Sequence, residues 1–220
     1  MTVSQFDVLL RRVALSDIEL IRSWRNSDRV RLNFIHRKHI SVDQQKAWFN
    51  NIDNISNYYF LMMDQSRPIG VVDLRLGSME NGFTETGVFV GEPEYENSPK
   101  IPLFCLCIAN FGLRLLQETQ IASKVLKHNE RAIKINKMLG LFPFKEFDDY
   151  YLFQTFGEQS VECLLRFHET VLGYFQNPDF GNMIISMDNR SDSPELIEFI
   201  QKRYNTVPAE FTESIKLEIT

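Results

Sequence analysis

The sequence predicts a mixed α/β domain in which helices cover both faces of a sheet, and three observations indicate this fold class. Segments of strand length with apolar or alternating patterns are interspersed with segments of helical periodicity. Capping-box patterns at residues 16–19 (Ser-Asp-Ile-Glu) and 41–44 (Ser-Val-Asp-Gln) mark two helix starts. Residues 103–117 are apolar on nearly every side, which is typical of a buried helix.

The first half of the chain contains one predicted strand, two helices and three further strands. Residues 6–13 alternate between apolar and more polar positions and predict the first strand. The capping boxes start the two helices, and the first of these ends or bends at residues 26–28. The three strands follow at 58–63, 68–76 and 83–90, and Asn81-Gly82 is the turn signal between the last two.

The second half begins with a proline-containing loop, residues 91–102, and Pro102 suits the first position of the buried helix. Asn129 is the predicted N-cap of a later helix that runs to Leu139. The other elements expected here are a strand at 121–126 and an antiparallel pair of strands at 146–154 and 161–168.

The remainder of the chain differs from what precedes it, and a strand at 183–187 and a helix from 194 to about 204 are its predicted elements. We therefore divide the chain into a domain of residues 1–169 and a C-terminal extension of residues 170–220 whose role stays open. The extension is a candidate for covering a cleft, mediating a homodimer or binding a partner.

The composition excludes several classes of function. The formal net charge is −5, so no basic surplus exists for a nucleic acid backbone. No stretch approaches the ~18 apolar residues that a membrane helix needs, and residues 1–5 do not resemble a signal peptide. Three cysteines argue against a disulfide framework and make no zinc pattern, so we expect no metal. These features indicate a cytoplasmic protein.

Five segments resemble, in the same order, the GNAT superfamily of N-acetyltransferases. Trp24-Arg25-Asn26 is similar to a signature of the branch that contains ribosomal-protein N-terminal acetyltransferases and the aminosugar acetyltransferase of pseudaminic acid synthesis. The other four are residues 40–49, 68–71, 85–91 and 124–141, the last containing Asn129-Glu130-Arg131-Ala132 and Leu139-Gly140-Leu141. The resemblance covers roughly residues 6–168 and implies the GNAT fold, with a mixed, mostly antiparallel sheet.

The resemblance implies an acyltransferase that uses acetyl-CoA, or another acyl-CoA, and a small-molecule primary amine. A nucleotide-linked aminosugar is the first expected acceptor and a protein N-terminus is the second. Two departures support an alternative, a GNAT-fold protein that has lost catalysis and acts as a binding or assembly module. The loop at residues 97–102 lacks the family's glycines, and Asn136 occupies the position of a common acidic Tyr.

The resemblance also implies the site residues. Glu85 is the expected base for the amine, and the backbone N–H of Val88 is the expected donor to the oxyanion. The end of the buried helix is expected to bind the pyrophosphate, with Lys100 supplying a charge. The residues expected to contact the cofactor are Val88, Phe89, Val90, Asn97, Ser98, Lys100, Ile101, Asn129, Ala132 and Asn136.

The acceptor residues implied by the resemblance are Arg25, Asn26, His36 and His39, which lie in or after the first helix. Several of the predicted site residues also have a purely structural explanation. The histidines belong to a basic segment that is equally typical of a solvated loop. Asn129 serves as an N-cap whether or not it contacts a ligand, and Glu85 has the alternative of an ordinary strand carboxylate.

Overall fold

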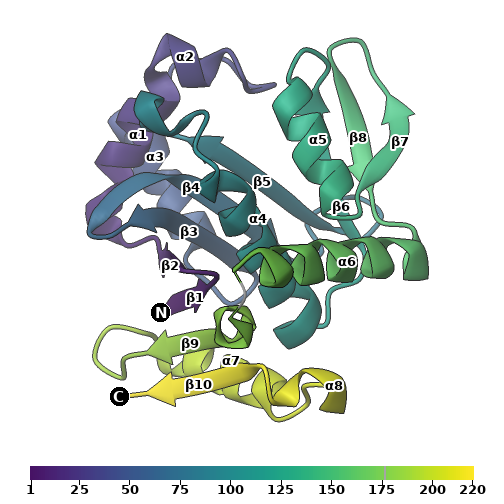
Figure 1. The fold of residues 1–220 in the computed structure, drawn as a ribbon. Helices are drawn as coiled ribbons and strands as arrows, with labels where there is room; N and C mark the ends of the chain where they lie inside the picture. The colour runs from purple at the N-terminus through teal and green to yellow at the C-terminus, as the bar shows by residue number, and fades with distance from the viewer. Residues whose placement is uncertain (176) are drawn as a thin grey trace.

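The predicted mixed α/β class is confirmed by a computed structural model, which describes residues 1–175 and 177–220 (Figure 1). Within these residues the strands form one sheet in the order β10-β9-β1-β2-β3-β4-β5-β6-β8-β7. The pairs β5–β6 and β9–β10 are parallel, and the other neighbours are antiparallel. The strands are β1 (Thr2–Gln5), β2 (Val8–Arg12), β3 (Asn57–Asp64), β4 (Arg67–Arg75), β5 (Thr84–Val90), β6 (Ile121–Leu126), β7 (Phe142–Glu146), β8 (Tyr150–Gln154), β9 (Met183–Met187) and β10 (Ile215–Ile219).

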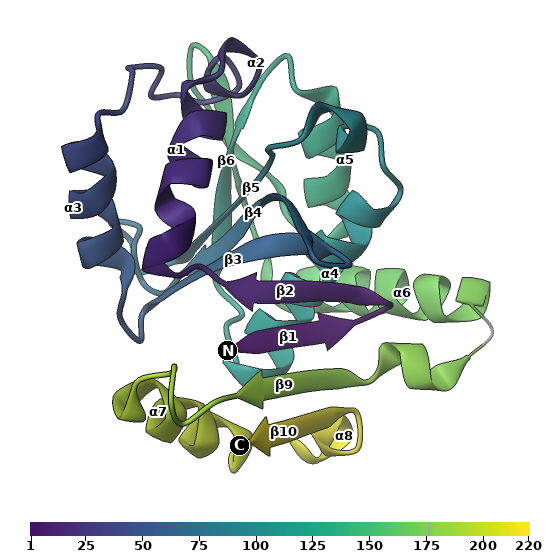
Figure 2. The ribbon, with the colours of Figure 1, turned by 90° about the vertical axis from the view of Figure 1, so that its left-hand side faces the viewer.

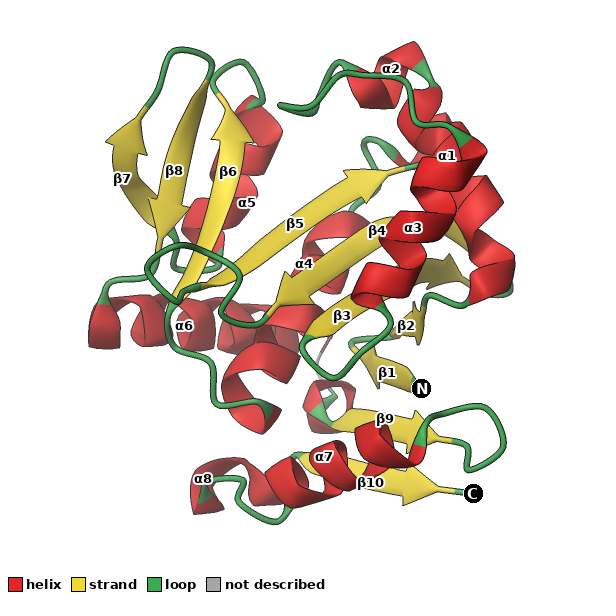
Figure 3. Cartoon of the chain, turned by 180° about the vertical axis from the view of Figure 1, so that it is seen from behind, coloured by secondary structure: helices red, strands yellow, loops and turns green. Residues whose placement is uncertain are grey.

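Helices pack on both faces of the sheet, as the sequence predicts (Figure 3). On one face, α1 and α3 bury Ile21, Trp24 and Phe49 against the strands. On the other face, Phe111 follows the end of α4 and packs edge-on against Tyr58 of β3. The helices are α1 (Ile18–Asn26), α2 (Asp28–Arg31), α3 (Val42–Ile52), α4 (Lys100–Asn110), α5 (Glu130–Met138), α6 (Gly157–Phe175), α7 (Pro194–Tyr204) and α8 (Ala209–Thr212).

The buried helix α4 starts two residues before Pro102, its predicted first residue. Its first residue is Lys100, and Pro99 is the N-cap. Pro102 therefore occupies the third helical position instead of the first. It is tolerated there because the N–H groups of the first turn have no partner within the helix.

The predicted strand at residues 6–13 contains β2 but begins with the turn of a hairpin, in which β2 pairs with β1. Phe6 and Asp7 form its turn, both with positive φ angles of 54° and 58°. A positive φ is unusual for a bulky residue such as Phe. Phe6 is nevertheless fully buried, with its ring 5.1 Å from the ring of His168. The packing of the Phe6 ring thus fixes the turn at Phe6 and Asp7, although a positive φ is locally unfavourable for Phe.

The predicted strand at 161–168 is wrong, because these residues lie within the long helix α6. Its buried residues Ser160, Leu164, His168 and Val171 recur every three or four positions, which is the period of a helix face. Strand β8 pairs with both β6 and β7 instead. The predicted strand at 146–154 covers β8 and the turn that joins it to β7.

The C-terminal residues continue the sheet beyond the N-terminal hairpin. Strand β9, which the sequence predicts, is antiparallel to β1, and β10 is parallel to β9. Figure 2 shows β2, β1, β9 and β10 following one another. The sequence analysis missed β10, although Ile215, Leu217 and Ile219 alternate with charged residues. In the described residues, no helix combines the length and the hydropathy that a membrane span requires.

Gly91, which follows β5, determines how closely α1 can approach the sheet. A Cβ atom at this position would overlap the ring of Trp24, a buried residue of α1. We expect Gly91→Ala to lower the free energy of unfolding by about 1–3 kcal/mol, because a well-packed core must shift to accept extra atoms. Urea denaturation measures this change.

The control is Gly173→Ala in α6, where an added Cβ meets no atom within 4 Å. This replacement should leave the stability unchanged or raise it, because alanine favours a helix over glycine. Equal stabilities of the two variants would contradict the assigned role of Gly91.

Candidate active site

Strands β5 and β6 diverge after a short parallel contact. They pair at only two positions, Thr84 opposite Ile121 and Glu85 opposite Ala122. Beyond this contact, β5 stays paired with β4 and β6 stays paired with β8, so a gap opens between them (Figure 3). A groove of about 1060 Å³ is lined by residues from both strands. Side chains therefore leave the gap open.

The backbone of β5 presents a hydrogen-bond donor to this gap. Thr84 N–H donates to the Gln120 carbonyl next to β6 at 2.9 Å, and Gly91 N–H donates to the Ile69 carbonyl of β4 at 2.8 Å. Because N–H directions alternate along a strand, the even-numbered residues of β5 point their N–H groups toward β6. The Val88 N–H accordingly faces the gap, beyond the last paired position.

The N-terminus of α4 lies at the open end of the groove, where Asn97 and Ile101 contribute to the lining. Two backbone N–H groups of its first turn donate hydrogen bonds to the preceding loop. The Ser98 hydroxyl accepts from the N–H of Lys100 at 3.2 Å, and the Ser98 carbonyl accepts from the N–H of Ile101 at 3.3 Å. These long hydrogen bonds leave the helix end available to attract an anion through its dipole.

The ammonium group of Lys100 is directed away from the groove. Its Nζ atom lies 2.6 Å from Oδ1 of Asp64 at the end of β3, and the hydroxyl of Tyr95 donates to the same carboxylate. The hydrogen bond from Lys100 lowers the pKa of Asp64. Lys100 is thus occupied by a partner within the protein.

Helix α5 supplies the opposite wall of the groove and a cation that the sequence analysis missed. Asn129 caps the helix by accepting from the N–H of Ala132 at 3.0 Å, and the Asn136 amide donates to the Ala132 carbonyl at 2.8 Å. Arg131 reaches across to α4 and donates to the Ser98 carbonyl at 3.0 Å. Arg131 lines the groove and places its charge beside the end of α4.

The groove continues through the gap to the face of the sheet that carries α1 and α3. Cations dominate its lining, with seven Arg and Lys residues against three carboxylates. The cations are Arg25, Arg29, Arg37, Lys38, Arg75, Lys124 and Arg131, joined by His36 and His39, and the carboxylates are Asp73, Glu85 and Glu96. The groove as a whole is therefore suited to a ligand with negative charge.

Arg25 and Asn26 have different surroundings, although they are neighbours at the end of α1. The Arg25 guanidinium lies over the Phe34 ring at 3.5 Å from its centroid, and burial lowers its pKa. Within the described residues, its buried Nε atom has no hydrogen-bond partner. Asn26 instead donates to and accepts from the backbone of Ile40, and so holds the loop that carries the histidines.

A cluster of charged residues lies on this face beside the gap. Asp73 accepts a hydrogen bond from Arg75 at 2.9 Å and lies against Gly87 of β5. Burial raises the pKa of Asp73 to about 6, against the opposing effect of Arg75. Glu85 is held between Arg75, at 3.1 Å, and Lys124, at 3.3 Å. The ionised form of Asp73 is therefore less stable here than that of a carboxylate in water.

The structure brings most of the predicted site residues to this one groove. Those that line it are Glu85, Val88, Phe89, Val90, Asn97, Ile101, Asn129, Ala132, Asn136, Arg25, His36 and His39. Ser98, Lys100 and Asn26 lie nearby but do not line it. Their roles, like those of the others, stay predictions.

The residues that sequence analysis missed are Asp73, Arg75, Lys124 and Arg131. The sequence does indicate Asp73 and Arg75 as a pair, because charged residues at alternate positions of an apolar strand face the same side of the sheet. Arg131 lies within residues 129–132, but only Asn129 and Ala132 of this segment are predicted to contact the cofactor. The described residues include no group of three or more His, Cys, Asp or Glu residues with the arrangement of a metal site.

Comparison with protein families finds that residues 7–141 match the acetyltransferase (GNAT) domain. No protein of curated function matches the sequence. An uncharacterized protein from Bacillus halodurans has a similar structure, with a TM-score of 0.63 and 15% identity over 74% of this chain and 91% of the other.

Two further similar structures were solved with coenzyme A. The spermidine N-acetyltransferase from Vibrio cholerae, in complex with CoA and spermine, has a TM-score of 0.58 and 16% identity over 67% of this chain and 92% of the other. The aminoglycoside acetyltransferase AAC(6')-Ib, in complex with coenzyme A, has a TM-score of 0.60 and 13% identity over 71% of this chain and 98% of the other. At these identities, the likenesses show the fold.

Proposed function

The chain belongs to the GNAT acetyltransferase family, and on that premise we propose that it acetylates a primary amine on a small molecule that also carries negative charge. The chain is an acetyl-CoA-dependent N-acetyltransferase. A nucleotide-linked aminosugar has the proposed chemistry, because it combines an amine with a diphosphate.

The observation that carries this proposal is the excess of cations in the lining of the groove. Asp73 and Glu85 lie beside the gap, where a substrate amine would be received. Arg25, Arg37 and Lys38 lie further along the same surface and are suited to a phosphate group. Spermine in the Vibrio cholerae structure, and kanamycin in a second structure of the aminoglycoside acetyltransferase, carry several positive charges and would be repelled by such a surface.

The proposed reaction is direct attack of the amine on the thioester in a ternary complex. Asp73 takes the proton from the ammonium group, and the neutral nitrogen then forms a bond to the carbonyl carbon. The N–H of Val88 donates to the oxygen, which becomes negative in the tetrahedral intermediate. When the carbonyl re-forms and the carbon–sulfur bond breaks, the attacking nitrogen loses its second proton to solvent, and the CoA thiolate leaves and takes a proton from solvent.

The proposal is tested with the full chain in two steps. Acetyl-CoA and free CoA should each raise the melting temperature, because a ligand that binds only the folded state stabilises it. Acetyl transfer is then measured with a UDP-linked amino sugar, a peptide with a free N-terminus, spermidine and kanamycin. We expect the largest kcat/KM with the UDP-linked amino sugar.

Arg25→Gln provides the specificity control for this measurement. It should raise KM for the UDP-linked sugar more than for the peptide, because it removes a cation from the acceptor surface. Preferential acetylation of spermidine or kanamycin would contradict the proposed acceptor class. CoA binding without transfer to any of the four amines would favour the alternative of a binding module.

A further inference from the structure

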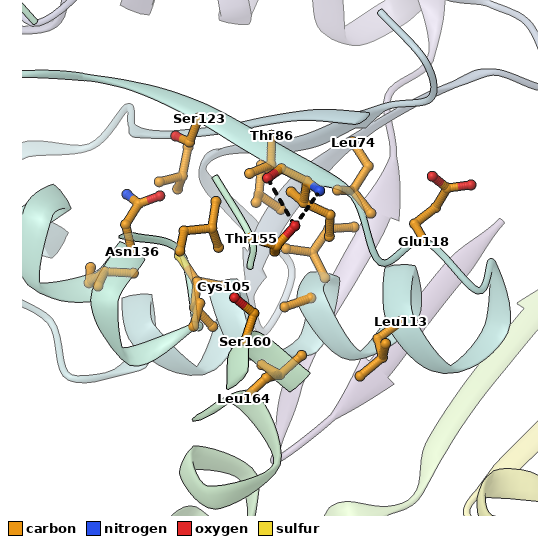
Figure 4. Close-up of a pocket in the computed structure, with 18 of the residues that line it drawn as sticks. Leu74, Thr86, Cys105, Leu113, Glu118, Ser123, Asn136, Thr155, Ser160 and Leu164 are labelled. Carbon is orange, nitrogen blue, oxygen red and sulfur yellow. Dashed lines mark hydrogen bonds between the residues drawn. The ribbon is translucent and has the colours of Figure 1, made fainter. Parts of the chain in front are cut away.

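A second, smaller cavity of about 70 Å³ lies on the α4 face of the sheet, opposite the charged cluster. Figure 4 shows its lining, to which Thr86 of β5, Ser123 of β6, Cys105 of α4, Asn136 of α5 and Leu164 of α6 contribute. It occupies the narrow end of the gap, behind the point where β5 and β6 separate. The proposed acetyl transfer does not require this cavity.

The cavity adjoins the groove that is assigned to acyl-CoA. Both are lined by Thr86, Gly87, Val88, Ser123, Ile135 and Asn136. The Val88 N–H, the proposed partner of the thioester oxygen, lies on this shared border. A thioester bound there has its acyl carbons next to the cavity, while its pantetheine arm extends toward the open end of the groove.

The walls of the cavity are mostly apolar. The aliphatic residues of the lining are Val72, Leu74, Ile108, Ala109, Leu113, Ile121, Leu139, Leu141, Val161 and Leu164, and Ile135 and Val88 lie at the border. Cys105 adds a thiol whose pKa is raised to about 12 by burial, so it is neutral at pH 7. Such a surface favours a hydrocarbon ligand over water.

Three polar side chains at the cavity make hydrogen bonds within the protein itself. The Thr155 hydroxyl accepts from the Ile121 N–H at 3.0 Å, as the dashed lines in Figure 4 show, and Glu118 accepts from Thr84 at 2.7 Å. The Ser160 hydroxyl donates to the carbonyl of Gly140. Because these groups already have partners, they do not require a polar ligand.

We infer that this cavity receives the acyl chain of the donor, so that the protein accepts straight-chain acyl-CoA esters longer than acetyl-CoA. The inference rests on the proposed function, because it needs CoA to bind in the gap. A single water needs about 10–15 Å³ of such space, so 70 Å³ holds a chain of several carbon atoms. Butanoyl and hexanoyl groups are the sizes that fit this description.

The test measures dissociation constants of CoA, acetyl-CoA, butanoyl-CoA and hexanoyl-CoA for the full chain by isothermal titration calorimetry. Butanoyl-CoA should bind roughly tenfold more tightly than acetyl-CoA, because burying each methylene group tightens binding about three- to fourfold. Equal or weaker binding of butanoyl-CoA and hexanoyl-CoA, with acetyl-CoA still bound, would overturn the inference alone. Failure of every CoA compound to bind would overturn the proposed function.

Two variants change the cavity in opposite directions. Ala109→Leu adds atoms to its wall and should abolish the advantage of butanoyl-CoA over acetyl-CoA while leaving the affinity for CoA unchanged. Leu164→Ala enlarges the cavity and should shift the tightest binding toward a longer chain. The control is Leu196→Ala in α7, a residue that is similarly buried, at 3% exposed against 5% for Leu164, but lies outside the cavity.

The variants distinguish a cavity that binds the acyl chain from a residue that only stabilises the core. The control variant should lose stability and keep the wild-type order of chain lengths. An unchanged order of chain lengths in both Ala109→Leu and Leu164→Ala would show that the acyl chain lies elsewhere, and the inference would be wrong.

Discussion

Asp73→Asn is expected to lower kcat by about 10²- to 10⁴-fold, the range that general bases contribute. An amide has the size of the carboxylic acid but cannot take a proton from the ammonium group. The fold should survive the replacement, because Arg75 keeps its ion pair with Glu85 at 3.1 Å. The measurement is steady-state acetylation of the preferred amine, with melting temperatures of both proteins as the test of folding.

The pH dependence of the wild type gives a second readout for Asp73. Burial raises the pKa of Asp73 to about 6, and only its ionised form acts as a base. Activity should therefore be retained above pH 6 and fall as the pH is lowered through 6. The groups that surround Asp73 and set this value are Arg75, Glu85 and Arg25. In Asp73→Asn, the residual activity should no longer show this inflection.

Glu85→Gln is the matched variant, since the resemblance to the family points to Glu85 as the base. Arg75 and Lys124 both lie within 3.3 Å of this carboxylate and hold it in two ion pairs, so its oxygens are less free to reach a substrate ammonium group. We expect the loss of kcat in Glu85→Gln to be smaller than in Asp73→Asn. A greater loss in Glu85→Gln, with the inflection near pH 6 kept in Asp73→Asn, would identify Glu85 as the base.

The positions of most candidate site residues could be predicted from the sequence, through its resemblance to one family. The strands that contain Val88 and Lys124 are separated by the buried helix, and five segments of the first 168 residues resemble one family in that order. The apolar helix α4 and the cap at Asn129 are local patterns that short-range physics determines. These features placed twelve predicted residues around one groove.

The acid–base cluster and the N-terminal hairpin could not be predicted in this way. Asp73 lies opposite Gly87 only because of the register between β4 and β5, which no local pattern specifies. Phe6 adopts a positive φ in a turn because α6 offers its ring a buried site beside His168. The long-range contacts of these residues outweigh their local preferences.

Arg131→Gln is expected to weaken the binding of CoA by about 10- to 150-fold, which corresponds to the loss of ~1.5–3 kcal/mol from a charged hydrogen bond. Residues 97–102, which lead into α4, contain no glycine, and Pro99 and Pro102 cannot donate hydrogen bonds. A cation must therefore supply part of the attraction for the pyrophosphate. Arg131 lines the groove and lies beside the end of α4, where it donates to the Ser98 carbonyl at 3.0 Å.

Lys100→Gln is the comparison that separates the two cations. The sequence suggests Lys100 as the phosphate-binding charge, but its ammonium lies 2.6 Å from Asp64 and outside the groove lining. Calorimetric titration of each variant with CoA and with 3'-dephospho-CoA measures the two contributions without catalysis. We expect Lys100→Gln to bind both compounds nearly as the wild type does, and Arg131→Gln to lose affinity for both equally. The opposite order would mean that Lys100 leaves Asp64 when the cofactor binds, and that the N-terminus of α4 rearranges around the pyrophosphate.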